Sequence, residues 1–196
     1  MTVVNLVVED SLSEAVLRRI LSDAQIPVGT CYGLQGNNYI KQRVRAFSSA
    51  ACHGKYFMLT DLDSNPCPTQ LINDWVNGVT LGTGLLFRVA VKEVESWLLA
   101  DKANFSKYLG ISSVRIPQNP DSIDNPKELI IELAKHSNKR SVRVDIAPAP
   151  GSTGRRGKDY NGSLIRFVQG TWDYRVAANH SKSLNGVLKN LSRLAN

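Results

Sequence analysis

The sequence lacks any long hydrophobic run. No apolar stretch in its 196 residues approaches the roughly 20 residues that a membrane-spanning helix needs. The first ten residues, MTVVNLVVED, end in two acids, whereas a secretory signal begins with basic residues before an apolar stretch. We therefore expect a soluble, cytoplasmic protein with no membrane partner.

Cysteine is also scarce. The three cysteines, Cys31, Cys52 and Cys67, are an odd number and show no Cys-x-x-Cys spacing. This excludes a disulfide framework and a standard zinc site, since both need regularly spaced cysteines. We expect three reduced thiols, with Cys67 serving as a small structural residue.

Acidic residues are few at the C-terminal end. Residues 139–196 hold 11 Lys and Arg against 3 Asp and Glu, whereas residues 1–138 hold 13 against 14. A basic segment of this kind favours a polyanionic partner, because each cation that neutralises a phosphate releases counterions. The alternative is a solvated basic surface without a partner.

Apolar runs alternate with helical patterns over the first 100 residues. Strands are expected at Val3–Val8, Val28–Leu34, Tyr56–Thr60 and Leu85–Val91. Between them, helical spacing follows Ser11, residues 40–51 and residues 68–76, and a further helix begins near Glu93. Ser11 and Glu14 have the spacing of a capping box. Four strand–helix repeats predict an α/β fold with a four-stranded parallel sheet flanked by helices.

The pattern changes after Gly110, which suits a helix C-cap. We expect an α/β core over residues 1–110 and a mainly helical, basic C-terminal extension over 111–196, packed on the core. In this extension, Asn125, Pro126 and Glu128 begin a helix, and the last helix carries an apolar face from Leu184 to Leu194. That face favours packing within the chain over an oligomer seam, although an oligomer stays possible.

Three carboxylates follow predicted strands. Glu9 ends the first strand, and Asp61 and Asp63 follow the third. In open parallel sheets ligands bind at the carboxyl ends of the strands, so these residues form a candidate site. Two like charges about 4 Å apart repel by roughly 4 kcal/mol at an effective dielectric near 20, so a cation is needed between them. We expect Mg²⁺, or Mn²⁺ in its place, and phosphodiester hydrolysis as the chemistry. The simpler interpretation is that the aspartates only form a turn.

Glu after a first strand and Asp-x-Asp after a third strand resemble the TOPRIM fold of topoisomerases, primases and overcoming-lysogenisation-defect nucleases. The segment RVAVKEVESWLLAD, Arg88 to Asp101, also resembles a motif of small stand-alone TOPRIM-like proteins, domain-of-unknown-function family 4276. The resemblance implies that Glu9 is a general acid/base or metal ligand and that Asp61 and Asp63 are metal ligands.

The same resemblance implies that Glu93 and Glu95 are additional acids, for a second metal. Glu95 has a competing explanation, since an acid in a first helical turn is stabilised by the helix dipole. Two residues depart from the family pattern. Asp10 stands where a glycine usually follows the first-strand Glu, and the next acid, Glu14, lies five residues after Glu9 and is explained by helix capping.

The segment GSTGRRGK, residues 151–158, fails as a phosphate-binding loop. Five residues instead of four separate Gly151 from Gly157, and Asp159 follows Lys158 where Ser or Thr is required. A clamp on a nucleic-acid backbone fits better, with Arg155, Arg156 and Lys158 on phosphates and the Tyr160 ring against a base. A merely solvated loop is the alternative.

Two functions are therefore carried forward. The first is a metal-dependent TOPRIM-like nuclease acting on DNA or RNA; the resemblance implies that it is the effector of an anti-phage defence complex with an ATPase partner. The second is a catalytically silent TOPRIM-like subunit that binds nucleic acid or its partner. A haloacid-dehalogenase-type phosphatase is disfavoured, because that family places its Asp-x-Asp on the first core strand.

Overall fold

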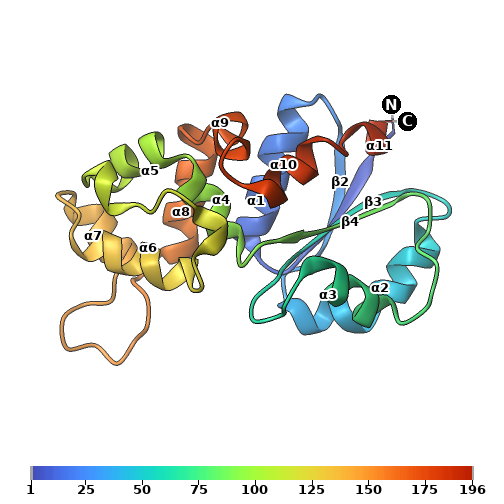
Figure 1. Cartoon of the computed structure of the whole chain (residues 1–196), viewed down its shortest axis with the longest axis horizontal. Helices are drawn as coiled ribbons and strands as arrows, with labels where there is room; N and C mark the ends of the chain where they lie inside the picture. The colour runs from blue at the N-terminus through green and yellow to red at the C-terminus, as the bar shows by residue number, and fades with distance from the viewer. Residues whose placement is uncertain (1, 196) are drawn as a thin grey trace. The chain divides into compact units, whose positions relative to one another are not determined.

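Four apolar segments form one parallel sheet in the computed structural model, which describes residues 2–195 (Figure 1). The strands are β1 (Val4–Val8), β2 (Val28–Gly33), β3 (Lys55–Asp61) and β4 (Leu85–Ala90), in the order β2-β1-β3-β4. β1 and β3 lie in the centre and are buried on both faces, which explains their nearly uninterrupted apolar sequences.

Helices cover both faces of this sheet. The connecting helices are α1 (Ser11–Asp23), α2 (Asn37–Ala50) and α3 (Pro68–Val76). In Figure 1, α2 and α3 lie on one face and α1 on the other. The face under α2 and α3 is a core that includes Val7, Met58 and Phe87. The predicted α/β fold with a four-stranded parallel sheet is thus confirmed.

The start of α1 differs from the expected capping box. Asp10, not Ser11, is the N-cap, and its Oδ1 accepts a hydrogen bond from the Ser13 amide at 2.9 Å. Glu14 pairs with Arg18 at 2.7 Å, one turn further along the helix. Asp10 is a favourable N-cap for two reasons. Its carboxylate accepts a hydrogen bond from the first turn, and its negative charge is stabilised by the positive N-terminal end of the helix dipole.

The chain divides into two compact units. The first contains residues 1–91 and 185–196, and the second contains residues 92–184. The boundary expected after residue 110 therefore falls inside the second unit. The second unit contains two short 3₁₀ turns, Ser113–Arg115 and Pro120–Ser122, and the helices α4 (Val94–Ala100), α5 (Lys102–Leu109), α6 (Pro126–Lys135), α7 (Arg140–Ile146), α8 (Tyr160–Gly170) and α9 (Tyr174–Ala178).

The apolar stripe near the C-terminus is divided between two helices, α10 (Lys182–Leu188) and α11 (Ser192–Ala195), where one helix was expected. Leu184, Val187 and Leu194 are nonetheless buried. Within the first unit, α11 contacts β3. The stripe is therefore used for packing inside the chain, as the sequence favoured.

The three cysteines are free, as expected. Cys67 is the N-cap of α3, and its Sγ accepts a hydrogen bond from the Gln70 amide at 3.4 Å. Burial and the nearby Glu14 raise the pKa of the Cys31 thiol to about 11, so Cys31 stays protonated at neutral pH. No helix within residues 2–195 has the length and apolar character required to span a membrane.

A close backbone approach at Gly84 yields the first prediction. A Cβ added there would collide with the carbonyl oxygens of Gly54 and Ala51, which belong to backbone and cannot rotate away. We expect Gly84→Ala to lower the free energy of unfolding by about 1–3 kcal/mol in urea titrations. Gly186→Ala is the control, since nothing lies within 4 Å of its Cβ position and α10 should gain up to about 1 kcal/mol. Equal stability of the two variants would contradict the close approach.

Candidate functional site

The carboxyl ends of β1 and β3 lie side by side. Val8 pairs with Leu59 in the parallel register, so the next residues, Glu9 and Thr60, are also adjacent. The pairing of the two central strands thus brings together residues that are 51 positions apart in the chain. This is the edge where ligands bind in open parallel sheets.

Glu9 is fixed by two donors from β3. Its Oε1 accepts a short hydrogen bond from the Thr60 hydroxyl and a second one, at 2.8 Å, from the Asp61 amide. Both donors hold the carboxylate in one orientation at the end of the sheet. Sequence reasoning missed Thr60, although the residue opposite Glu9 follows directly from the strand register.

The charge on Glu9 is poorly compensated. Burial raises the pKa of Glu9, the hydrogen bonds from Thr60 and Asp61 lower it, and the charges of Asp63 and Asp10 raise it again, with a net shift upwards. Within residues 2–195, Glu9 forms no ion pair with Lys or Arg. A carboxylate in this position is stabilised by an added cation.

Asp63 lies on the exposed side of the same edge. Its backbone adopts the left-handed conformation, with φ of 50°, which aspartate tolerates better than most residues. Its Oδ2 accepts a hydrogen bond from the Asn37 side-chain amide, at the start of α2, at 3.1 Å. The neighbouring Gly36 amide donates to the Glu9 carbonyl at 3.0 Å, so three loops meet here.

Asp61 does not join Glu9 as expected. Alternation along β3 places Asp61 on the same face as Leu59, whereas Thr60 and its partner Glu9 belong to the opposite face. Glu9 is bonded to the backbone amide of Asp61 and not to its side chain. Among the described residues, 2–195, no group of three or more His, Cys, Asp or Glu side chains is arranged to hold a metal.

Two carboxylates without a Lys or Arg partner among residues 2–195 can still hold magnesium. Mg²⁺ keeps several waters and is commonly held by one or two carboxylates together with substrate phosphates. Glu9 and Asp63 meet this requirement, because they are close enough for their charges to interact and neither is paired with a Lys or Arg in the described part of the chain. Their hydrogen bonds to Thr60 and Asn37 are the orienting contacts that metal ligands usually have.

Glu93 and Glu95 belong to the second unit. The Glu93 carboxylate accepts the Lys127 amide at 2.9 Å, which caps the first turn of α6 from outside that helix. Glu95 is 2% exposed, lies 3.6 Å from the Lys127 ammonium and accepts the Tyr160 hydroxyl at 3.2 Å. Both acids thus have hydrogen-bond and ion-pair partners within the second unit, and these contacts are consistent with a structural role.

The later part of the family-like segment, from Lys92 to Asp101, also builds the second unit. Asp101 is fully buried and accepts the side-chain amide of Asn104 at 2.9 Å and the amide of Asp173 at 2.8 Å, tying α5 to the start of α9. Trp97 is fully buried, and its carbonyl accepts the indole N–H of Trp172 at 3.2 Å. The segment therefore forms the centre of a helical core.

The predicted basic loop is exposed, with one exception. Arg155, Arg156 and Lys158 lie on the long segment between α7 and α8 that runs out from the helices in Figure 1. Tyr160, by contrast, is 4% exposed, and the Arg156 guanidinium lies 5.5 Å from its ring centroid. Burial and the adjacent Glu95 raise the pKa of Tyr160 well above its usual value. Its ring is therefore not available to a base, contrary to expectation.

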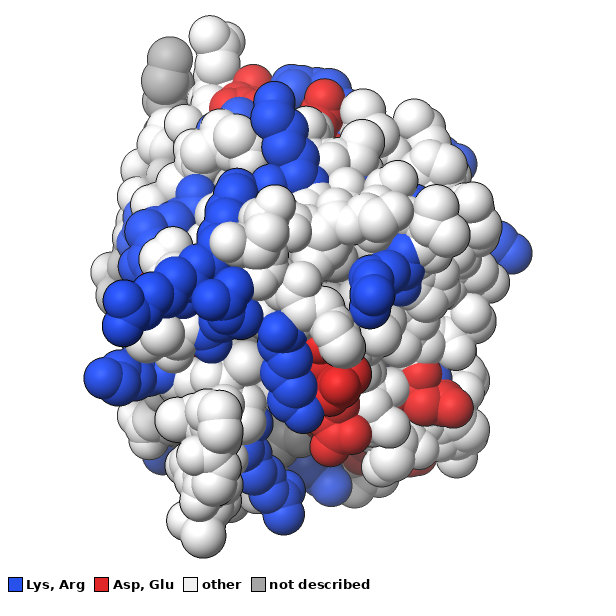
Figure 2. Space-filling view, turned by 90° about the vertical axis from the view of Figure 1, so that its left-hand side faces the viewer, with Lys and Arg blue, Asp and Glu red and all other residues white. Residues whose placement is uncertain are grey.

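The surface around the second unit is strongly basic. In the space-filling view, Lys and Arg side chains gather on one side of the face, with few acids among them (Figure 2). Lys107, Lys139 and Arg140 are exposed, and the Lys139 ammonium also caps α5 by donating to the carbonyls of Lys107 and Tyr108 at 2.8 and 2.9 Å. Lys107 and Arg140 lie on helices and Lys139 is the N-cap of α7, so all three are outside the loop that the sequence singled out.

Comparisons with known proteins add no identification. No family model matches the chain, and neither the curated proteins nor the solved structures contain a significant match.

The Glu95 contacts yield a second prediction. Tyr160→Phe removes a donor from a buried carboxylate and is expected to lower the free energy of unfolding by about 1–3 kcal/mol. Tyr39→Phe is the control, because the Tyr39 ring stacks with Arg43 through its face and loses only an unneeded hydroxyl. Urea unfolding followed by circular dichroism measures the free energy of unfolding of both variants. An unchanged value for Tyr160→Phe would show that the hydrogen bond from the Tyr160 hydroxyl to Glu95 does not contribute to stability.

Proposed function

We propose that this chain is a divalent-metal-dependent nuclease of TOPRIM-like type, which hydrolyses phosphodiester bonds in DNA or RNA. The observation that carries the proposal is the position of Glu9. This carboxylate is fixed at the carboxyl end of β1 by Thr60 and the Asp61 amide, near Asp63 and without a cationic partner in the described residues.

Glu9 and Asp63 would hold Mg²⁺ or Mn²⁺ at this edge. When bound, such an ion activates a water molecule and neutralises charge on a phosphate. Thr60 orients Glu9, and Asn37 orients Asp63. These two polar residues therefore act as positioning residues for the acids.

The resemblance implies further metal ligands besides Glu9 and Asp63. Asp61 lies on the other face of β3, so its role as a ligand stays a prediction from the family pattern. The same holds for Glu93 and Glu95, which are already bonded to Lys127.

The basic surface supports nucleic acid as the substrate. Arg155, Arg156 and Lys158 are exposed on one loop, where they can contact phosphates. We also propose, from the resemblance, that the chain acts as an effector in anti-phage defence with an ATPase partner.

The central test is cleavage with and without metal. We expect the wild-type protein to cut DNA or RNA only when Mg²⁺ or Mn²⁺ is present. Glu9→Gln and Asp63→Asn keep the size of each side chain but remove its charge, and each should lower the cleavage rate about 100-fold or more. Asp74→Asn, on the exposed side of α3, is the matched control and should cleave normally.

Metal binding by calorimetry separates the possible outcomes. Loss of both Mn²⁺ binding and cleavage in Glu9→Gln supports the nuclease. Metal-independent binding of nucleic acid without cleavage by the wild type, unaffected by Glu9→Gln, would instead indicate the catalytically silent subunit.

The basic loop makes a separate prediction. Arg155→Ala/Arg156→Ala should weaken nucleic-acid binding and lower the slope of log affinity against log salt by about 2, since each phosphate contact contributes about 1. Lys41→Ala/Arg45→Ala removes the same charge from the exposed side of α2 and should keep the slope. Fluorescence anisotropy over a salt series measures this, and equal slopes for the two double variants would remove the loop from the interface.

A further inference from the structure

A half-buried arginine lies in the middle of an otherwise apolar strand. Arg88 is the only charged residue of β4, whose sequence is LLFRVA. Its Nε is enclosed by the protein and has no hydrogen-bond partner in the structure. An enclosed guanidinium nitrogen without an acceptor is unfavourable, because the donor has lost water and gained nothing in exchange.

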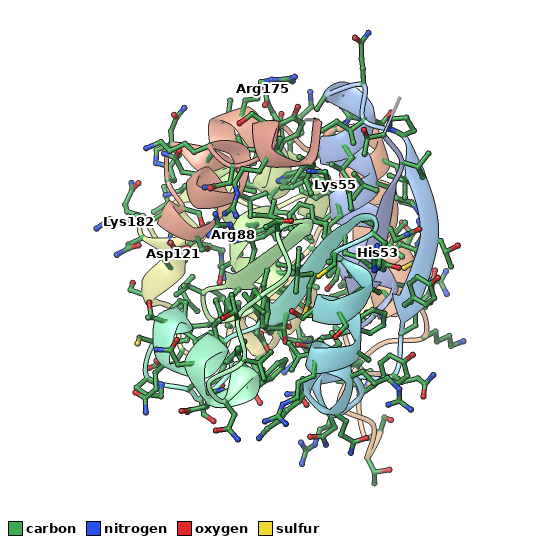
Figure 3. All side chains as sticks on the ribbon, turned by 90° about the vertical axis from the view of Figure 1, so that its right-hand side faces the viewer. His53, Lys55, Arg88, Asp121, Arg175 and Lys182 are labelled. Atoms are coloured by element: carbon green, nitrogen blue, oxygen red, sulfur yellow. The ribbon has the colours of Figure 1, made fainter. Side chains whose placement is uncertain are left out.

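A second cation of the sheet, Lys55, lies on the same face as Arg88. Arg88 pairs with Leu59, and alternation along β3 places Lys55 on the Leu59 face. Figure 3 shows the labelled Arg88 and Lys55 on the side of the sheet away from α2 and α3. The Lys55 ammonium donates to the Arg193 carbonyl at 3.2 Å, which attaches α11 to this face.

The charges of Arg88 and Arg193 repel one another. Burial lowers the pKa of Arg88, and the charge of Arg193 lowers it further. Within residues 2–195, Arg88, Arg193 and Lys55 form no ion pair with Asp or Glu. Folding therefore brings the charge of Arg88, on β4, close to that of Arg193, on α11.

The geometry points to a phosphate-binding site formed by Arg88 and Arg193 and supported by Lys55. Arginine presents its N–H donors as a planar fork, and the two Nη groups can meet two oxygens of one phosphate. A phosphate dianion would also offset the repulsion between two cations, which a carboxylate does only in part. The site is separate from the Glu9 edge, so it goes beyond the proposed nuclease centre.

Inorganic phosphate is the first probe. Calorimetry in EDTA, at ionic strength held constant with sodium chloride, should show phosphate binding by the wild-type chain and at least about tenfold weaker binding by Arg88→Met. Arg45→Met, an exposed arginine on α2, is the control and should bind as the wild type does. Phosphate binding that survives Arg88→Met, or equal binding of acetate, would overturn the proposal.

Thermal unfolding tests the cost of the unpaired guanidinium. Without phosphate, Arg88→Met should melt at or above the wild-type temperature, because a buried donor and a repulsion have been removed. Phosphate should raise the melting temperature of the wild type and not that of the variant. A large loss of stability in phosphate-free buffer would show that Arg88 is a structural residue and overturn the site.

Arg193→Met provides a variant outside the sheet. Arg193 is exposed on α11, so its replacement should leave the core intact while weakening phosphate binding several-fold. No change in its affinity for phosphate would exclude the shared site.

A short oligonucleotide in EDTA distinguishes two sources of phosphate. Parallel losses of oligonucleotide and phosphate affinity in Arg88→Met would assign the site to a nucleic-acid backbone. A loss for inorganic phosphate alone would assign it to a free phosphate group. Because metal is absent, failure of the cleavage proposal leaves this result unaffected.

Discussion

The parallel pairing of β1 with β3 is the constraint on which the candidate site depends. Both strands are central and apolar, so their register is set by burying alternate residues on two faces. That register places Thr60 beside Glu9, and a slip of one residue would move the hydroxyl to the other face. The same periodicity separates the side chains of Glu9 and Asp61. Burial of hydrophobic residues thus selects which carboxylates meet.

Acids in the second unit are used differently. Glu93, Glu95 and Asp101 each accept hydrogen bonds from other helices, and Lys127 lies near two of them. A buried carboxylate is tolerated only when such donors surround it, so these acids specify how short helices pack. The part of the TOPRIM-like segment from Lys92 to Asp101 is accordingly explained by the architecture of a helical core. Glu9 and Asp63, by contrast, have no Lys or Arg partner among residues 2–195.

Cations in this chain are in two physical environments. Arg155, Arg156 and Lys158 are exposed, where water screens them and a polyanion would gain mainly by releasing counterions. Arg88 is half-buried and one of its donors is enclosed. In such an environment, a single acceptor oxygen in the right position stabilises the guanidinium more than the net charge of a ligand does. Composition indicated only the first kind, because a charge count does not distinguish one arginine inside an apolar strand from an exposed one.

The sequence alone determined the order of strands and helices, the α/β class and the segments rich in charge, since these follow from local periodicity and composition. It also located Glu9, Asp61 and Asp63 near strand ends. Tertiary structure decided that Asp10 caps α1, that the C-terminal stripe splits into two helices, that Tyr160 is buried and that Glu9 is bonded to the backbone amide of Asp61. Each of these depends on which distant residues compete for the same space or the same hydrogen bond, and local sequence does not encode that competition.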